Sequence, residues 1–252
     1  MKYYFLVSYL PELTQEDKKL RLRLADLLAE KEQFDPGDWR EIELVLLGGD
    51  VVILERLLAG KSPQVEHSLY RPDFWKEQIK TPKEGPEFLL EFLQSLSSGL
   101  FGPEETKRLY GAYYAYVLEN SANEALKEYI AFERDLRNIL AAIRARRRGL
   151  SPAAQLVGES DVVEVLARSS AEDFGLSRDY PFVERLLAAK DPLVMEAEIE
   201  RILWGRLDEM AGGDVFDFET ILAYLLKLQL LEKRLSLSHQ EGLETIRRLE
   251  GA

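Results

Sequence analysis

The stretch AGKS at residues 59–62 resembles the end of a phosphate-binding loop. Such a loop has the pattern G-x-x-x-x-G-K-S and follows a β-strand, so that its backbone amides surround the phosphates. In this chain the position of the first glycine is Glu55, and a helical pattern precedes the stretch. We therefore expect no nucleotide binding at Lys61, and we interpret Gly60 as the C-terminus of a helix.

The two histidines lack the spacing of a metal site. His67 and His239 have Gln64 and Ser236 three residues before them, so the Glu-x-x-His pattern of di-iron helical bundles is absent. The chain contains no cysteine, which excludes disulfides, thiolate metal ligands and Cys/His catalytic pairs. The residue types and spacings therefore predict no metal site and no cofactor.

Carboxylates are plentiful but occupy positions typical of solvated helix faces. Glu104 and Glu105 fall in a predicted first turn, where the helix dipole favours negative charge. Glu196, Glu198 and Glu200 border an apolar stripe of a later helix. Because no pair can be assigned to acid and base roles from spacing alone, the sequence predicts no catalytic residue.

Arginines are concentrated at one place in an otherwise acidic chain. The formal net charge is −12, yet five arginines lie between positions 137 and 148. An acidic total argues against a general nucleic-acid binder, because phosphate neutralisation requires a concentrated basic face. On a helical wheel, Arg146 and Arg147 return to the line of the apolar stripe that contains Leu136, Leu140 and Ile143.

Two interpretations of these arginines remain open. In the first, the last turn of the helix projects beyond the core and binds a partner through Arg144, Arg146, Arg147 and Arg148. In the second, the arginines complement the negative end of the helix dipole, while their aliphatic stems cover apolar edges.

Caps, prolines and apolar periodicity predict an all-α chain in which more than about half of the residues are helical. Only Tyr3–Tyr9 resembles a short extended segment, and four prolines suggest an irregular connection from 61 to 86 pinned by aromatic rings. The expected helices, opened by caps such as Thr14 with Asp17 or closed by glycine pairs, cover residues 14–35, 38–48, 50–60, 86–98, 103–119, 122–148, 161–168, 180–189, 192–211 and 218–235.

Length and composition suit one helical body. A chain of 252 residues that is 46% hydrophobic can bury a stable core. We expect a single body over 1–252, divided into lobes 1–85 and 86–252 at the irregular connection. No apolar run approaches 18 residues, and the apolar run at the start is too short and too aromatic for a signal peptide.

The helix after Asp217 is apolar around most of its circumference, with Lys227 nearly alone on its side. This pattern predicts that the helix lies at the centre of a bundle or against a partner.

Three segments resemble a known family. YIAFERDLRNILAAIRARRRG at 129–149 is similar to a helix of the C subunit of V-type and A-type ATPases, called subunit d in the eukaryotic enzyme. In that helix an acidic residue and Asn precede an apolar stretch and a basic, glycine-terminated end. EAEIERILWGRLDEM at 196–210 and FDFETILAYLLKLQLLEKRL at 216–235 resemble later helices of the same subunit. The stretch after Glu232, KRLSLSHQEG, departs from the family pattern because it lacks the Arg-Asn pair and the basic ending.

The start of the chain, KYYFLVSYLPEL, resembles a family of uncharacterised bacterial proteins whose genes lie among V-type ATPase genes. Together these likenesses imply an all-helical, funnel-like, non-catalytic subunit in the central stalk of a bacterial V/A-type ATPase. Such a subunit docks the rotor axle onto the membrane rotor ring and transmits torque. Its partners are the axle subunits and the ring, and its place is cytoplasmic, peripheral to the membrane through the complex.

Two other functions remain open. One is a helical regulatory scaffold unrelated to an ATPase, which gene neighbourhood would distinguish from a stalk subunit. The other is a small helical enzyme that uses carboxylates, which a bound metal or substrate turnover would favour.

Overall fold

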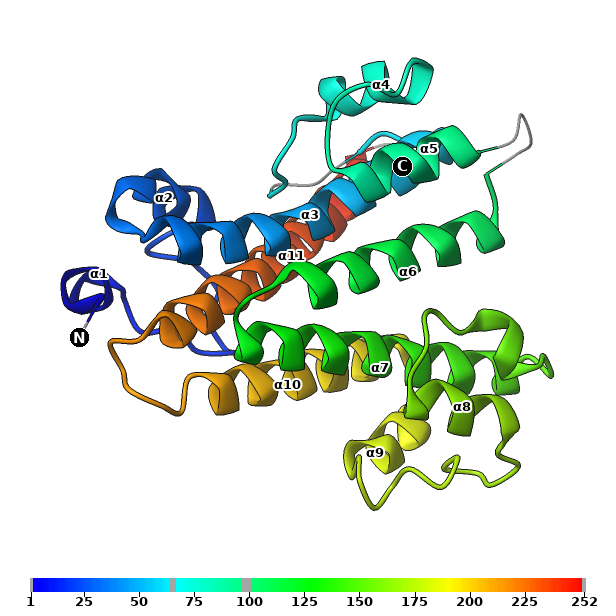
Figure 1. The fold of residues 1–252 in the computed structure, drawn as a ribbon. Coiled ribbons are helices and arrows are strands. Elements are labelled where there is room, and N and C mark those ends of the chain that lie inside the picture. Colours follow the sequence, from blue (N-terminus) through cyan, green and yellow to red (C-terminus); the bar gives the residue numbers. More distant parts are fainter. Residues whose placement is uncertain (1, 64–66, 97–100, 251–252) are drawn as a thin grey trace. The chain divides into compact units, whose positions relative to one another are not determined.

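The computed structural model describes residues 2–63, 67–96 and 101–250, and it leaves the side chains of residues 238–250 undescribed. Over this described part the fold is 68% helical and contains no β-strand, which confirms the predicted all-α class. The helices are shown in Figure 1 and are α1 (Tyr4–Tyr9), α2 (Leu24–Ala29), η1 (Lys31–Gln33), α3 (Pro36–Leu58), α4 (Pro72–Lys80), α5 (Glu87–Ser95), α6 (Pro103–Asn120), α7 (Glu124–Arg147), η2 (Pro152–Gln155), α8 (Asp161–Arg168), α9 (Phe182–Ala188), α10 (Pro192–Met210) and α11 (Phe218–Glu250).

The chain divides into two compact units, one of residues 40–198 and one of residues 1–39 with 199–252. Both limits fall inside a helix, within α3 and within α10. The predicted lobe boundary at 85/86 lies inside the first of these units. A limit inside a continuous helix has no Gly-rich or Pro-rich linker to mark it, so punctuation in the sequence gives no sign of it.

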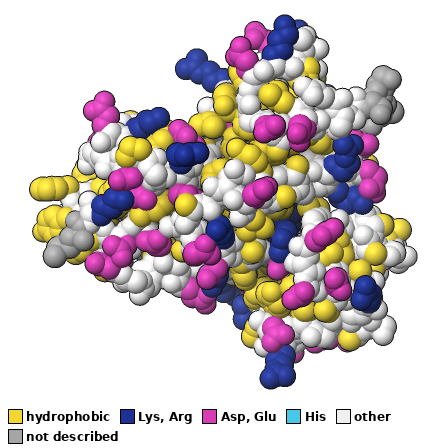
Figure 2. Space-filling model, viewed as in Figure 1, with side chains coloured by type: hydrophobic (Ala, Val, Ile, Leu, Met, Phe, Trp, Pro, Cys, Tyr) yellow, Lys and Arg dark blue, Asp and Glu magenta, His cyan; other side chains and the backbone are white. Residues whose placement is uncertain are grey.

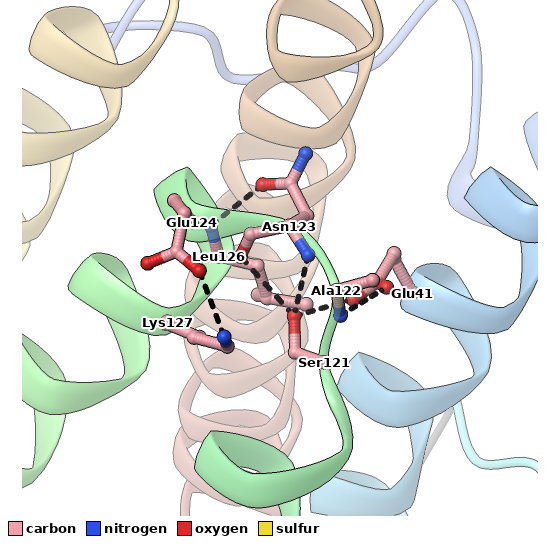
Figure 3. A network of polar contacts seen from close by, with 7 residues as sticks. All are labelled: Glu41, Ser121, Ala122, Asn123, Glu124, Leu126 and Lys127. Carbon is pink, nitrogen blue, oxygen red and sulfur yellow. Dashed lines mark hydrogen bonds and ion pairs between the residues drawn. The ribbon is translucent and has the colours of Figure 1, made fainter.

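In the 40–198 unit, α6 and α7 lie side by side and are joined by a short turn (Figure 1). Glu41 on α3 holds this turn, because its carboxylate accepts hydrogen bonds from the Ser121 hydroxyl at 2.6 Å and the Ala122 amide at 2.8 Å (Figure 3). Asn123 then caps α7 by accepting from the Leu126 amide at 2.9 Å. The predicted helices over 103–119 and 122–148 are therefore confirmed to within about two residues, the usual uncertainty of helix ends.

α3 is continuous through Gly48 and Gly49, so the predicted pair of helices turning at these glycines is wrong. The glycines serve close packing instead. A Cβ on Gly48 would lie 3.0 Å from the Tyr113 hydroxyl of α6, and a Cβ on Gly49 would lie 1.9 Å from the carbonyl oxygen of His67. Glycine inside a helix is tolerated where another backbone must approach closely, and this need is invisible in the local sequence.

α4 lies within the stretch predicted to be an irregular connection, and the helix was not predicted. Its first position is Pro72, whose fixed φ suits a helix start. The prediction that aromatic rings hold this connection in place is confirmed. The Tyr70 ring stacks on Phe74 with 4.4 Å between the ring centroids, and it packs edge-on against the buried Trp75 with 5.6 Å between the centroids. The predicted end of the next helix, residues 97 and 98, lies outside the described part of the chain.

In the unit formed by residues 1–39 and 199–252, α11 is the longest helix, and its apolar side chains Ile221, Leu225 and Leu228 are fully buried. This agrees with the all-round apolar pattern predicted for it. Lys227 is not isolated, because its ammonium group forms an ion pair with Asp208 and lies 5.0 Å from the centre of the Trp204 ring on α10.

Two predictions for the N-terminal segment are wrong. Tyr4–Tyr9 is the short helix α1 and not an extended segment. Within residues 14–35 the only α-helix is α2, and the Thr14–Asp17 cap closes an isolated turn. The Arg234 guanidinium on α11 binds the carbonyl oxygens of Gln15 and Asp17, so the backbone groups that a longer helix would use are engaged by tertiary contacts.

Candidate partner-binding site

The predicted partner-binding arginines lie at the C-terminal end of α7, and Gly149 ends this helix. Gly149 has φ of +68°, a conformation that glycine adopts without strain. Its amide donates to the carbonyl of Arg146 at 2.9 Å, and the amide of Leu150 donates to the carbonyl of Ala145 at 2.9 Å. These two bonds form a Schellman motif, so the basic, glycine-terminated pattern is a helix C-cap.

The acidic residue and the asparagine of the family-like pattern hold the segment that follows α7. Asn138 is fully buried and makes a reciprocal pair with Val157, donating to its carbonyl at 2.9 Å and accepting from its amide at 2.8 Å. Asp135 accepts from the hydroxyl of Ser160 at 3.0 Å, and Ser160 caps α8. Both side chains therefore fix the path of residues 157–160 across α7.

Arg146 binds the segment after α8. Its guanidinium lies over the ring of Phe174 at 3.5 Å from the centroid and donates to the carbonyl oxygens of Ser169 and Ala171. Phe174 is buried and has φ of +60°, which is uncommon for a residue other than glycine. The arginine thus supports a turn that the backbone alone does not favour.

Arg147 caps a different helix. One of its nitrogens, Nη2, donates to the carbonyl oxygens of Leu186, Leu187 and Ala189 at 3.0–3.2 Å, at the C-terminal end of α9. Positive charge at a helix C-terminus is favourable because the last carbonyls carry partial negative charge. The interpretation by dipole complementation therefore holds for Arg147, but the helix that it serves is α9 and not α7.

The prediction that the last turn of α7 projects beyond the core is wrong. Ala145 in that turn is buried, and Arg146 and Arg147 bind neighbouring segments of the same unit. Arg144 and Arg148 are exposed, and their side chains form no hydrogen bond or ion pair with the described residues. Of the four predicted residues, Arg144 and Arg148 are therefore the two whose charges remain available to a partner.

Arg137, the first arginine of the cluster, acts inside the unit. Its guanidinium lies 3.6 Å from the centre of the Tyr110 ring, and the Tyr110 hydroxyl donates to Glu55 on α3 at 2.8 Å. Burial raises the pKa of the Tyr110 hydroxyl, so this group stays protonated and remains a donor. The contact ties α7 to α6 and α6 to α3.

A buried carboxylate, which the sequence analysis did not identify, lies at Asp50 on α3. Its Oδ1 accepts from the indole nitrogen of Trp75 at 2.7 Å and the amide of Tyr70 at 3.0 Å, and its Oδ2 accepts from the amide of Leu69 at 2.8 Å. Burial raises the pKa of the Asp50 carboxyl to about 6, against the opposing effect of these donors. The signal that could have revealed it is an acidic residue inside the apolar run of α3, at a position facing the core.

Gly60, Lys61 and Glu105, which the sequence analysis also considered, contribute to the ends of helices. The Gly60 amide donates to the Leu57 carbonyl at 3.0 Å and the Lys61 amide to the Arg56 carbonyl at 2.8 Å, which confirms the helix C-terminus predicted at Gly60. Glu105 accepts from the Gly102 amide at 3.0 Å and so caps α6.

The carboxylates of α10 pair with arginines. The Glu198 carboxylate lies 3.1 Å from the Arg185 guanidinium, and Glu200 forms an ion pair with Arg234.

The side chain of His239 lies outside the described part of the chain, and so does Gln64. Over the side chains that are described, no group of three or more histidines and carboxylates has the arrangement of a metal site. In the same residues, no helix combines the length and apolar character that a bilayer crossing requires.

Residues 1–251 match the sequence profile of a family described as "Protein of unknown function (DUF2764)". The chain belongs to this family. A relative from Chlamydia muridarum (strain MoPn / Nigg), named "Uncharacterized protein", is 24% identical over 267 residues, which covers 99% of this chain and 97% of the relative. No solved structure matches the chain. Neither the family description nor the name of the relative mentions an ATPase.

Proposed function

We propose that this chain is a non-catalytic central-stalk subunit of a bacterial V/A-type ATPase, placed between the rotor axle and the membrane rotor ring. The observation that supports the proposal is the organisation of α7. Three residues of the family-like pattern have defined roles there, with Asp135 and Asn138 holding the following segment and Gly149 ending the helix. The resemblance to the ATPase C subunit therefore includes the residues that determine the local path of the chain.

The position of the remaining arginines adds to this proposal. A coupling subunit needs a surface that forms contacts in the cytosol and resists torque, and charge complementarity sets the encounter rate and the register of such a contact. Arg144 and Arg148 stand at the end of a helix that is fixed on its sides by Arg137, Arg146 and Arg147. A rigid helix end that presents two guanidinium groups suits the binding of carboxylates or helix-end carbonyls.

Co-purification tests the proposal. The full chain, tagged and expressed at its natural level, is recovered from membranes after mild solubilisation, and the bound proteins are identified by mass spectrometry. We expect axle and ring subunits of a V/A-type ATPase at stoichiometric yield. Recovery of the chain with other proteins and without rotor subunits would favour the regulatory scaffold, and substrate turnover by the isolated chain would favour the enzyme.

A further inference from the structure

A cluster of exposed aromatic side chains covers one face of α1. We define the aromatic patch as Tyr4, Phe5 and Tyr9 of α1 together with Val215 of the loop before α11, and the exposed fractions of these side chains are 50%, 83%, 63% and 57%. The opposite face of α1 is buried through Leu6, which is 3% exposed. Figure 2 shows hydrophobic side chains gathered at the left edge of the molecule, over α1. Exposed aromatic groups gathered at one place mark interaction surfaces more often than single exposed apolar residues do.

The aromatic patch is held in place by its own unit. The Tyr3 amide donates to the Phe216 carbonyl at 3.2 Å, which fastens α1 to the loop before α11. The Tyr4 ring packs against Phe216 at 5.1 Å and against Phe5 at 5.8 Å. A surface that is ordered before binding loses little conformational entropy on association, so these rings are suited to bind a partner.

The charges beside the aromatic patch are negative. Asp214 is exposed and directly precedes Val215, and Asp217 follows in the same loop. Among the described residues, Lys2 is a cation beside α1 in the sequence, and its ammonium group lies 2.9 Å from Asp38 and 3.5 Å from Asp35, so its charge is compensated. The whole chain carries a formal net charge of −12.

The negative charges beside the aromatic patch indicate which kind of partner can bind it. A second copy of the chain would bring two acidic rims together, and an anionic membrane would be repelled by the same carboxylates. A segment with apolar side chains bordered by Lys or Arg fits both features of the surface. We propose that the aromatic patch binds such a basic amphipathic segment of another protein; that this protein is a rotor subunit rests on the proposed function.

A peptide probe tests the chemistry of the aromatic patch. The full chain is titrated against a helical Leu/Lys amphipathic peptide and its Leu/Glu counterpart, in the wild type and in the Phe5→Ser/Tyr9→Ser variant. The matched control is Leu193→Ser/Val194→Ser on α10, where the replaced side chains are 74% and 50% exposed. All replaced side chains are exposed, so circular dichroism and thermal unfolding should show that both variants keep the wild-type fold.

We expect the Leu/Lys peptide to bind the wild type and the control equally, and to bind the patch variant about tenfold more weakly. The Leu/Glu peptide should bind none of the proteins. Equal affinity of the Leu/Lys peptide for wild type and patch variant would overturn the proposal. So would a wild-type dimer that the patch variant converts to a monomer in light scattering, or patch-dependent binding to phosphatidylglycerol vesicles.

The same variants separate this inference from the proposed function. If rotor subunits co-purify equally with the wild type and the patch variant, and the Leu/Lys peptide also binds both proteins equally, the inference is wrong and the proposed function stands. If peptide binding depends on the aromatic patch but no rotor subunit is recovered, the inference stands and the proposed function is wrong. Loss of rotor subunits from the patch variant, with retention by the control, supports both.

Discussion

Arg146 and Arg147 show how charged side chains can organise a helical unit from within. The Arg146 guanidinium binds the segment that follows α8, and the Arg147 guanidinium binds the end of α9. Both donate to carbonyl oxygens that accept no hydrogen bond from a helical amide. Arginine is suited to this because its planar group can stack on a ring while its N–H groups donate sideways, as Arg146 does over Phe174.

Replacing both arginines by glutamine should therefore destabilise the protein. We expect Arg146→Gln/Arg147→Gln to lower the free energy of unfolding by about 2 kcal/mol. The carbonyl groups after α8 and at the end of α9 would lose charged hydrogen-bond donors, and the Phe174 ring would lose its contact with the Arg146 guanidinium. The control is Arg144→Gln/Arg148→Gln, which removes equal charge from exposed positions and should change stability by less than about 0.5 kcal/mol. Urea unfolding measures both, and equal losses in the two variants would contradict the assignment of structural roles.

Asp50 makes stability depend on pH. Its folded-state pKa is about 6, above its ordinary value of 3.8, so the folded protein binds the proton more tightly than the unfolded chain. Its contribution to stability is therefore fully present below pH 3.8 and is lost as the pH rises to about 6. The difference between the two pKa values corresponds to about 3 kcal/mol.

Comparison with Asp50→Asn isolates this contribution from the other carboxylates. We expect the stability of the wild type relative to Asp50→Asn to fall between pH 4 and pH 6, measured by guanidinium unfolding at each pH. If that relative stability rises with pH, the three hydrogen-bond donors outweigh burial, and the pKa of Asp50 lies below its ordinary value.

At the scale of elements, α3 depends on glycine for its contacts and not for its ends. Gly49 allows the backbone at His67 to approach the helix, and that approach brings the amides of Leu69 and Tyr70 to Asp50. The cost of glycine in a helix interior is thus offset by the hydrogen bonds that the close approach permits.

Gly49→Ala should be strongly destabilising for this reason. The added Cβ would lie 1.9 Å from a backbone oxygen, so the segment must move, and we expect a loss of about 3 kcal/mol or more in the free energy of unfolding. Gly205→Ala on α10 is the matched control, because nothing lies within 4 Å of its added Cβ. That variant should be more stable by roughly 0.5–1 kcal/mol, the ordinary helix propensity difference. A small effect at Gly49 in thermal unfolding would contradict the close approach.

At the scale of the whole molecule, the acidic surplus and the exposed arginines should make the proposed association with rotor subunits sensitive to salt. The chain has a formal net charge of −12, and Arg144 and Arg148 present positive charge at the end of α7. Contacts between such exposed groups are screened over about 8–10 Å at physiological ionic strength.

We expect Arg144→Gln/Arg148→Gln to weaken association with rotor subunits several-fold and to flatten its salt dependence, because the charge complementarity is lost. The folded chain should remain as stable as the wild type, since neither side chain binds a described residue. Binding measured at low and high salt tests this, with Lys18→Gln/Lys19→Gln at exposed positions as a charge-matched control. Unchanged binding by the Arg144/Arg148 variant would remove these residues from the proposed interface.

Local signals in the sequence determined the class of fold and most helix ends. Pro103 and Asn120 limit α6 close to the predicted positions, and Asn123 and Gly149 limit α7, because caps and left-handed glycines act through backbone groups a few residues away. The predicted C-terminus at Gly60 has the same local basis. The two lobes, the partners and the rotor function stay predictions.

The tertiary structure decided the features that depend on contacts between distant segments. The roles of Gly48 and Gly49 follow from the approach of Tyr113 and His67, which no local pattern encodes. The helical stripe that contains Arg146 and Arg147 was visible in the sequence, but whether it met solvent or another segment depended on where residues 169–189 return. An arginine side chain can donate to any carbonyl oxygen that the fold brings close to it. The sequence therefore determined where the arginines lie along the helix, and the packing of distant segments determined which carbonyl groups they bind.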